Sequence, residues 1–443
     1  MTTGSIMGKI LIFALPIVLG NILQQLYTTV DSLVIGHYCD SQALAAVGTS
    51  SQPVEVILCI FLGIGTGVSI LISQSMGAGQ TKRIKILSHT AASFIYMCGI
   101  PLSILGWFLT PLILKFMSVP EDTYYYALIY TRVVFLGALG NLGYNMNAGI
   151  LRGLGDSTAS LYILLSSCIT NIVLDLVLVQ IFNLGVLGVA IATSAALYLS
   201  WLVSVLYIKI KFPEYDFSFL PKYFSKKELK NFLKLGLPIG LNNSLYSFGH
   251  MALQTLTNLQ GSTFMAGNAV AGRITGLSNI AITGMSNASS TFSGQNFGAK
   301  NFDRLNKGHL RIPLYSGLIT LSLGIFFILV RKPILGLFSK DEMVLMYAGR
   351  YVCVLCLSQW FYAVFNGISN FVNGTGRVRY TTLINLLMLW AVRIPTAYFI
   401  NRYFDGTYIM LCYPVSFSFG MFAMLGYTFF NKEWKDFLKQ KES

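Results

Sequence analysis

The sequence predicts an all-α polytopic membrane protein, with twelve transmembrane helices in two six-helix bundles related by a pseudo-two-fold axis along the membrane normal. Three observations support this fold class. Hydrophobic residues make up 54% of the 443 residues and charged residues only 11%, against roughly 25% charged in a soluble globular domain. The chain contains twelve apolar runs of about the 20 residues that cross a hydrocarbon core. Its second half also repeats its first half.

The apolar runs predict the transmembrane spans. They lie at about 10–36, 53–76, 90–112, 126–150, 158–182, 187–209, 231–258, 274–296, 310–330, 346–371, 380–400 and 408–430. The glycines of 63–67 in the second run follow no strand and precede no Lys-Ser/Thr pair. They therefore predict close helix packing rather than a nucleotide-binding loop.

The basic residues orient these spans. Of the 31 Lys and Arg residues, 22 fall on the side that holds the N-terminus, six fall on the opposite side, and three lie within or at the ends of spans. This positive-inside bias predicts a multi-pass protein of the cytoplasmic membrane with both termini in the cytoplasm. It also explains the net charge of +14 without a nucleic-acid partner. The expected partner is the lipid bilayer.

The chain repeats itself at a spacing of 221–222 residues. Leu15-Pro16-Ile17 recurs as Leu237-Pro238-Ile239, and Gly153-x-Gly155 recurs as Gly374-x-Gly376. Six spans per copy make the repeats parallel, with the main cavity expected between them, an arrangement typical of transporters. The predicted division is an N-terminal lobe at 1–209, a cytoplasmic linker at 210–230 and a C-terminal lobe at 231–443.

Two carboxylates lie deep within predicted spans, Asp31 and Asp175, and Glu55 lies near the outer end of the second span. A charge at the bilayer centre costs roughly 2.5–3.5 kcal/mol on insertion scales, so such residues are functional candidates. Counted from the cytoplasmic starts of their spans, both aspartates reach the outer half of the bilayer and can meet. Gln24 shares a helical face with Asp31, and Asn171 precedes Asp175 by one turn.

Together these four side chains predict a polar site suited to a proton or a sodium ion. The alternative is that each aspartate caps a kink or bonds a neighbouring helix. Carboxylate and amide oxygens suit either ion, so the sequence leaves H+ and Na+ open.

Several motifs resemble those of one known family. They are "LPIVLGNILQQLYTTVDSLVIGHY", "ALAAVGTSSQ", "ISQSMGAGQTKR" and "LRGLGDS" in the first copy, with "LPIGLNNSLYS", "SGQNFGAKN" and "VNGTGRVR" in the second. These motifs resemble those of multidrug and toxic compound extrusion (MATE) transporters. The resemblance extends over essentially the whole chain. The resemblance implies a twelve-helix, two-lobed antiporter that expels organic, often cationic, compounds in exchange for H+ or Na+.

The resemblance also implies site residues. It places a helix bend at Pro16, and a cation-coupling and substrate site at Asp31, Asp175, Gln24, Asn171, Thr193, Tyr130 and Asn147. The motifs around Tyr130 and Asn147 match less closely than the others. A bound Na+ would lie at Asp31, Asp175 and Asn171.

The second copy departs from this pattern. Asp31 falls on Ala252 or Leu253, and Asp175 falls on Thr396. One branch of the family carries acids in its second lobe, but spans seven, eight, ten and eleven contain none. The coupling site is therefore expected in the first lobe alone. His250 and Arg393 are the unusual polar residues of the second copy, and the sequence leaves their roles open.

Two other function classes fit the sequence less well. A flippase for a lipid-linked saccharide precursor shares this architecture, but it would need several cations in its cavity, and only Arg132, Arg350 and Arg393 lie near spans. A membrane-embedded enzyme is disfavoured because the chain has no H-E-x-x-H, no G-x-S-x-G and no Ser/His/Asp set at a plausible depth. We therefore expect a monomeric transporter of small organic molecules, without enzymatic activity, cofactor or resident metal. The sequence leaves the substrate unnamed.

Overall fold

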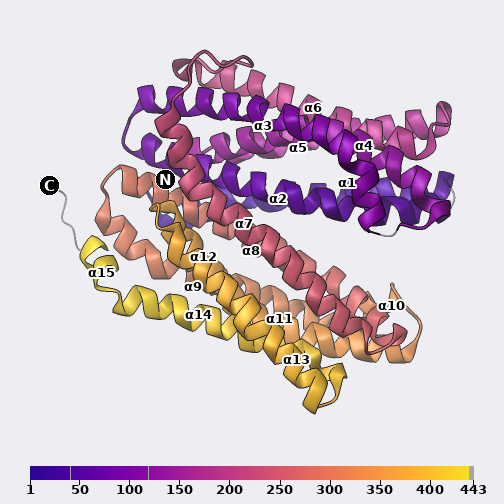
Figure 1. Ribbon diagram of the computed structural model, residues 1–443. Helices are drawn as coiled ribbons and strands as arrows, with labels where there is room; N and C mark the ends of the chain where they lie inside the picture. The colour runs from indigo at the N-terminus through magenta and orange to yellow at the C-terminus, as the bar shows by residue number, and fades with distance from the viewer. Residues whose placement is uncertain (40, 118, 439–443) are drawn as a thin grey trace. The chain divides into compact units, whose positions relative to one another are not determined.

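The computed structural model describes residues 1–39, 41–117 and 119–438, and they form helices joined by short connections, with no strand within these ranges (Figure 1). Helical elements cover each of the twelve predicted spans to within one residue, and three of the spans combine an α-helix with a π- or 3-10 turn. Ten of these helices are long and apolar enough to cross a membrane. The other two, α7 and α8, carry more polar side chains. The side chain of Glu55 lies outside the described part of the chain.

Large apolar side chains face outward on many of these helices, as lipid contact requires. Phe108, Ile210 and Phe430 are 72%, 79% and 85% exposed. Polar residues of α8 face inward instead, and Ser278, Ser289 and Asn296 are fully buried. An apolar exterior around a partly polar interior indicates a surface solvated by lipid.

The helices form two compact units. The first unit is Leu19–Leu241, and the second unit is Met1–Val18 with Asn242–Ser443. The unit boundaries fall inside α1 and α7, shortly after Pro16 and Pro238 respectively. These units are defined by packing, whereas the predicted lobes and linker follow the sequence repeat. The predicted lobe boundaries stay a prediction.

The first unit contains most of α1, five complete spans and the start of α7. Its elements are α1 (Ile6–Tyr38), α2 (Ser41–Gly77), α3 (Thr81–Phe116), α4 (Glu121–Leu154), α5 (Ser157–Leu176), η1 (Val177–Ile181), α6 (Gly185–Lys211), η2 (Pro213–Tyr215) and α7 (Lys226–Asn258). Helix α4 is central, because it packs against α2, α3 and α6.

The second unit has the matching arrangement around α11, which packs against α8, α9 and α14. Besides the start of α1 and the rest of α7, its elements are α8 (Ser262–Gly298), α9 (Phe302–Leu329), α10 (Arg331–Gly336), α11 (Glu342–Gly374), α12 (Val378–Leu386), η3 (Leu387–Arg393), α13 (Ile394–Tyr403), η4 (Gly406–Leu411), α14 (Cys412–Phe430) and α15 (Lys432–Leu438).

Glycines bring α2 against the start of α7 in the first unit. A Cβ atom at Gly63 would lie 2.1 Å from the backbone nitrogen of Gly240, and one at Gly67 would lie 2.6 Å from the carbonyl oxygen of Phe232. Only glycine permits backbones to approach this closely. The prediction of close helix packing at these two glycines is confirmed.

The connector between α4 and α5 shows why its sequence contains two glycines and an aspartate. A Cβ at Gly153 would lie 2.8 Å from Ile72 of α2, and Gly155 has φ +96° in the left-handed conformation that ends α4. The Asp156 carboxylate then accepts a hydrogen bond from the Ala159 backbone nitrogen at 3.0 Å and caps α5. Gly153 therefore permits close packing against α2, Gly155 ends α4, and Asp156 caps the start of α5.

The predicted linker at 210–230 is held against α3. The Asp216 carboxylate pairs with Lys85 at 3.0 Å and with Lys222 at 2.9 Å, and Arg83 pairs with Glu228 at 3.1 Å. These ion pairs lower the pKa of Asp216 to about 2, with the hydrogen bond from Lys222 as the largest cause and that from Lys85 next.

Candidate functional site

A polar cluster joins three helices of the first unit. Asp31 comes from α1, Asn171 and Asp175 from α5, and Thr193 from α6. The Asn171 side-chain nitrogen donates to the Thr193 hydroxyl at 3.5 Å, and that hydroxyl donates to an Asp31 carboxyl oxygen at 3.4 Å. Both distances are at the long end of hydrogen bonding. The structure thus brings together four of the predicted site residues.

The two carboxyl groups of the cluster lie within hydrogen-bonding range of each other. Asp31 is 9% exposed and Asp175 is 0% exposed. Neither oxygen of Asp175 has a hydrogen-bond donor among the described residues, and the side-chain oxygen of Asn171 has none there either. Two ionised carboxylates are both acceptors, so their contact becomes attractive only when a proton or a metal cation lies between them.

Two tyrosines flank the carboxyl pair. Tyr130 of α4 lies close enough for the charges of Asp31 and Asp175 to act on its hydroxyl. Tyr27 precedes Asp31 by one helical turn, feels the Asp31 charge and is hydrogen bonded by Gln24. Gln24 is therefore linked to the cluster through Tyr27. Tyr27 was not among the site residues predicted from the sequence. The i, i+4 spacing of Tyr27 and Asp31 on one helix face was the signal that could have identified it.

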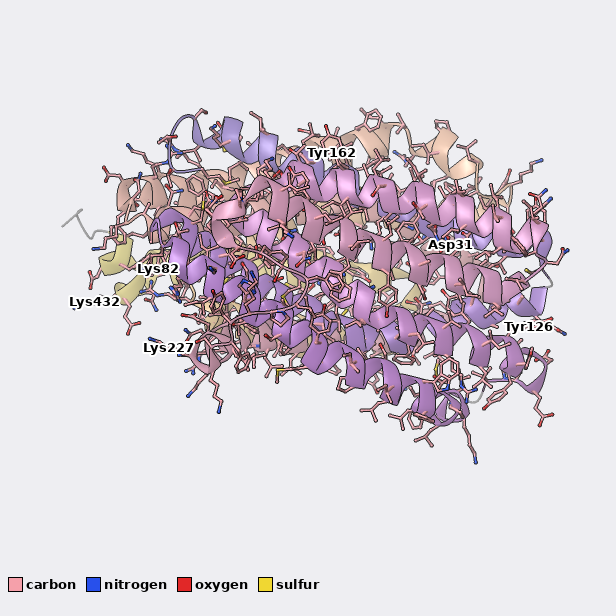
Figure 2. All side chains as sticks on the ribbon, turned by 90° about the horizontal axis from the view of Figure 1, so that it is seen from above. Asp31, Lys82, Tyr126, Tyr162, Lys227 and Lys432 are labelled. Carbon is pink, nitrogen blue, oxygen red and sulfur yellow. The ribbon has the colours of Figure 1, made fainter. Side chains whose placement is uncertain are left out.

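The cluster lies toward one end of the first unit. Figure 2 shows Lys82 and Lys227 at one end of its helices and Tyr126 at the other, with Asp31 nearer to Tyr126. About one turn beyond the cluster, an apolar layer fills the space between the helices. It consists of Val34, Ile35, Ala43, Val179, Val186 and Val189, with Tyr126 and Tyr130 packed against it. The layer packs on the Tyr126 side of the carboxyl pair (Figure 2).

A π-helical segment begins immediately beyond the cluster. Helix α5 ends at Leu176, one residue after Asp175, and η1 follows at Val177–Ile181. π-Helical turns inside α-helices are rare and occur frequently at functional sites.

Two predicted site residues lie apart from the carboxyl pair. Asn147 is buried in α4, where its side-chain nitrogen donates to the Ser204 hydroxyl of α6 at 2.8 Å. Pro16 lies inside α1, two residues before the point where the chain passes from the second unit to the first.

The second unit holds a different buried group. Arg393 ends η3, is 0% exposed and donates from Nε to the Ser416 hydroxyl at 2.9 Å and from Nη1 to the Tyr246 hydroxyl at 2.8 Å. His250 meets the ring of Tyr246 edge-on, with 5.0 Å between the ring centroids.

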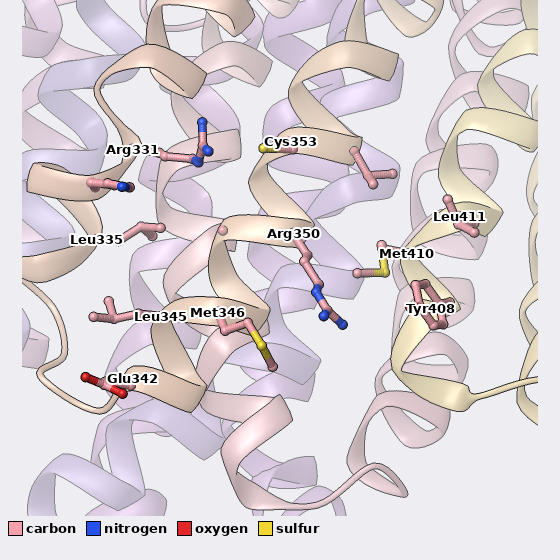
Figure 3. A pocket seen from close by; sticks show the side chains of 13 residues that line it. Arg331, Leu335, Glu342, Leu345, Met346, Arg350, Cys353, Tyr408, Met410 and Leu411 are labelled. Atoms are coloured by element: carbon pink, nitrogen blue, oxygen red, sulfur yellow. The ribbon is translucent and has the colours of Figure 1, made fainter.

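A separate groove of about 910 Å³ lies at the ends of helices in the second unit (Figure 3). Its lining combines Leu, Met and Val side chains with Arg331, Lys332, Glu342 and Arg350. Figure 3 shows Arg350 extending from α11 toward Tyr408 and Met410 of η4.

Comparison with known protein families identifies the family to which this architecture belongs. The MatE family model matches the chain twice, at residues 16–177 and 238–399. The two matches are equal in length, are 222 residues apart and cover well over half of the chain. The chain belongs to the MATE family. The predicted duplication is confirmed, and this MATE protein is a transporter rather than an enzyme.

Individual relatives match along most of the chain. The probable multidrug resistance protein YoeA of Bacillus subtilis is 28% identical, over 97% of this chain and 95% of its own length. The multidrug export protein MepA of Staphylococcus aureus is 23% identical, over 89% of this chain and 87% of its own length.

Solved MATE structures share the fold. An outward-facing MATE transporter matches with a TM-score of 0.88 and 22% identity, over 99% of this chain and 98% of the other. A MATE structure in complex with MaL6 matches with a TM-score of 0.89, 22% identity and the same coverage. The predicted all-α polytopic membrane fold is confirmed, and the protein is a multi-pass membrane transporter.

Proposed function

We propose that this MATE transporter is a secondary active antiporter that exports organic, often cationic, compounds across the cytoplasmic membrane in exchange for H+ or Na+. Relatives described as multidrug resistance and multidrug export proteins support the substrate class. The positive-inside distribution of Lys and Arg supports an orientation with both termini in the cytoplasm.

The observation that carries this proposal is the contact between Asp31 and Asp175. Their carboxyl groups lie within hydrogen-bonding range, and Asp175 has no donor among the described residues. A proton shared by the pair, or a Na+ held by the pair with the oxygens of Asn171 and Thr193, would make this contact attractive. Binding and release of that cation is the proposed coupling step.

Exchange follows from competition for the same negative charge. With the cation released, the pair carries a net negative charge that attracts an organic cation. With the cation bound, this attraction is weakened, so the drug affinity falls. Thermodynamic reciprocity requires the drug to weaken binding of the coupling ion by the same factor. Gln24 and Tyr130 are proposed to line the site, and the predicted role of Asn147 stays a prediction.

Access to the pair is proposed to change through α1. Pro16 has no backbone N–H, so the carbonyl of Ile12 lacks its usual helical partner, and α1 can bend there. Two of the similar structures are described as MATE in the bent conformation and MATE in the straight conformation. The apolar layer around Val34 and Val179 packs one turn beyond the pair, so bending of α1 would change the packing beside Asp31 and is proposed to open or close access to it.

The test is drug transport in inverted membrane vesicles with the pH gradient and the Na+ gradient imposed separately. Wild-type protein should transport under one of the two gradients, which identifies the coupling ion. Asp31→Asn should fall to the rate of vesicles without transporter, because the amide keeps the shape and removes the charge. Asp122→Asn, at an exposed carboxylate in the first turn of α4, is the matched control and should keep the wild-type rate.

Normal expression and a wild-type thermal midpoint are required of each variant. Wild-type transport by Asp31→Asn under both gradients would show that the carboxyl pair does not couple the ion.

A further inference from the structure

Arg393 is a fully buried cation in a spanning segment of the second unit. Such a group is costly unless an opposite charge compensates it. The acids of the chain beyond Asn242 are Asp303, Asp341, Glu342, Asp405, Glu433, Asp436 and Glu442. The first four lie at the starts of α9, α11 and η4, and the next two lie in α15. None of these six lies inside a span where it could pair with Arg393.

The contacts of Arg393 stabilise the guanidinium without neutralising it. Its hydrogen-bond acceptors are the neutral hydroxyls of Ser416 and Tyr246. The guanidinium carbon also lies 4.9 Å from the ring centroid of Tyr413 and 4.8 Å from that of Phe417. Cation–π contacts of this kind are favourable when they are desolvated, but the positive charge remains.

One nitrogen of the guanidinium is left without a partner. Nη2 is buried and has no acceptor among the described residues, and Nη1 uses only one of its two hydrogens for Tyr246. The Nη1 and Nη2 edge of arginine is the geometry that binds both oxygens of a carboxylate. The group that would satisfy this edge is therefore an anion.

The surroundings suit the anionic group of an organic molecule. The ring of Tyr362 is tilted against that of Phe417 with 4.6 Å between the ring centroids, and His250 contacts Tyr246. Ligand sites commonly combine aromatic walls with one charged anchor. The π-helical turn η3, which ends at Arg393, marks the position where this spanning helix departs from regular packing.

We propose that Arg393 binds the carboxylate of transported organic acids and zwitterions, so that the second unit selects for an anionic group. This inference rests on the proposed export function and assigns recognition of a carboxylate on the exported compound to one residue. The anchored ligand is an aromatic or amphipathic compound with one carboxylate, and binding requires η3 and α14 to separate enough to admit it. A free inorganic anion such as chloride has the same charge and is distinguished in the test.

The experiment compares a carboxylic acid with its methyl ester, which has the same shape without the charge. Dissociation constants are measured by fluorescence on purified protein for a fluorescent aromatic acid that carries no amine, and for its neutral ester. The wild type should bind the acid about 10- to 100-fold more tightly, the range expected of a charge-assisted hydrogen-bonded pair. Arg393→Gln should abolish this preference and leave the affinity for the ester within about twofold.

Arg393→Lys should retain part of the preference, because it keeps the charge and loses the paired donors. Arg402→Gln, at an exposed arginine of α13, should retain all of it. Equal affinities of wild-type protein for acid and ester would overturn the proposal even if the variants do not fold. Equal losses for both ligands in Arg393→Gln would assign Arg393 to structure alone and would also overturn it.

Chloride separates the two anion sources. If chloride raises the thermal midpoint of the wild type but not of Arg393→Gln, while acid and ester bind alike, the ligand is inorganic and the proposal fails. Retained transport of a drug without a carboxylate by Arg393→Gln would show that the antiport function stands independently of this result.

The groove of Figure 3 carries a second, independent inference. Its lining includes three cations, Arg331, Lys332 and Arg350, against one acid, Glu342. No salt bridge of these cations is found among the described residues. Asp405 is the other acid nearby: its pKa is lowered first by the Thr407 backbone nitrogen and also by the charge of Arg350. The groove therefore keeps an excess of positive charge.

The neighbouring side chains indicate that the groove lies at the depth of lipid head groups. Leu329 and Leu337, on either side of α10, are 76% and 83% exposed, and the cations lie at the ends of spans. Exposed apolar side chains beside cations are typical of the membrane interface. Apolar lining residues such as Leu345 and Met346 offer contact to an acyl chain.

We further propose that this groove binds an anionic phospholipid, with its phosphate between the three cations and an acyl chain along the apolar lining. Native mass spectrometry should detect phosphatidylglycerol retained over phosphatidylcholine on wild-type protein. Replacement of Arg331, Lys332 and Arg350 by Gln should remove this preference, and Lys300→Gln, at an exposed lysine beyond α8, should not. Equal retention of both lipids by wild type would overturn the proposal. A thermal shift with inorganic phosphate alone that equals the shift with phosphatidylglycerol would also overturn it.

Discussion

The two units carry opposite charges at related positions. In each unit the fifth helix of the repeat contains a π-helical turn, η1 in the first and η3 in the second. The first unit places the buried acid Asp175 beside this turn, with Asp31 in contact. The second unit places the buried cation Arg393 in the turn, among hydroxyls and aromatic rings. The duplication thus preserved an irregular helix and changed the chemistry next to it.

The same duplication also preserved a contact between two helices, but the atoms that lie against the glycine differ between the two copies. In the first unit α2 meets the start of α7 through backbone atoms at Gly63 and Gly240. In the second unit α8 meets the start of α1, where a Cβ at Gly284 would lie 2.5 Å from a side-chain methyl of Val18 and 3.2 Å from the carbonyl oxygen of Ala14. The nearest atom there belongs to a side chain and the backbone is farther away, whereas at Gly63 the nearest atoms are all backbone atoms.

The largest expected effect tests the acidic half of this comparison. Adding a cationic drug to wild-type protein in weak buffer near neutral pH should release about one proton per drug bound if H+ is the coupling ion. The double variant Asp31→Asn with Asp175→Asn should release none, and Asp122→Asn should behave as wild type. Equal release from wild type and the double variant would place the linkage outside the carboxyl pair.

The glycine contacts should differ in their effect on stability. Gly63→Ala drives a Cβ into the backbone of α7 and should lower the free energy of unfolding by about 3 kcal/mol. Gly284→Ala requires the Val18 side chain to move and the Ala14 carbonyl to shift by a few tenths of an ångström, and it should cost about 1 kcal/mol. Thermal midpoints of the two purified variants measure the difference. If Gly284→Ala is at least as destabilising, the two helix contacts are equally tight and the distinction is wrong.

A smaller effect is expected at His250. Its ring contacts Tyr246, which in turn accepts from Arg393, so His250→Ala should lower the rate of drug transport only about two- to threefold, through loss of ring packing. Transport in inverted vesicles measures this. Complete loss of transport at normal expression would move the proton carrier into the second unit.

The smallest effect concerns the segment held against α3. The pKa of Asp216 in the folded protein, about 2, lies below its ordinary value of 3.8, so its ion pairs stabilise the fold fully above about pH 4. This contribution is lost as the pH falls toward 2. Protection of the amides at 217–224 from hydrogen exchange, relative to their intrinsic rate at each pH, should fall over that range in wild type, and Asp216→Asn should already show the lower protection at pH 7. Protection in wild type that does not change between pH 4 and pH 2 would exclude Asp216 as the anchor.

The sequence alone predicted the fold class and the duplication, and these predictions succeed because lipid imposes local rules. It also singled out Asp31 and Asp175, which the structure brings into contact, while their role in coupling stays a prediction. A span must be apolar over about 20 residues and must satisfy its own backbone, so it is recognisable without its neighbours. The cost of a carboxylate in such a span likewise singles it out wherever it occurs. The motifs at Asn171 and Thr193 added two more members of the polar cluster.

The tertiary structure decided what depends on contacts between distant residues. It assigned the first 18 residues and the last part of α7 to the second unit. It joined Thr193 to Asp31 across 162 residues and Arg393 to Tyr246 across 147. It also placed Asn147 apart from the carboxyl pair, where its side chain donates a hydrogen bond to Ser204. A polar side chain in a span must find some partner, but its own sequence neighbourhood does not specify which, because helix packing determines which faces meet.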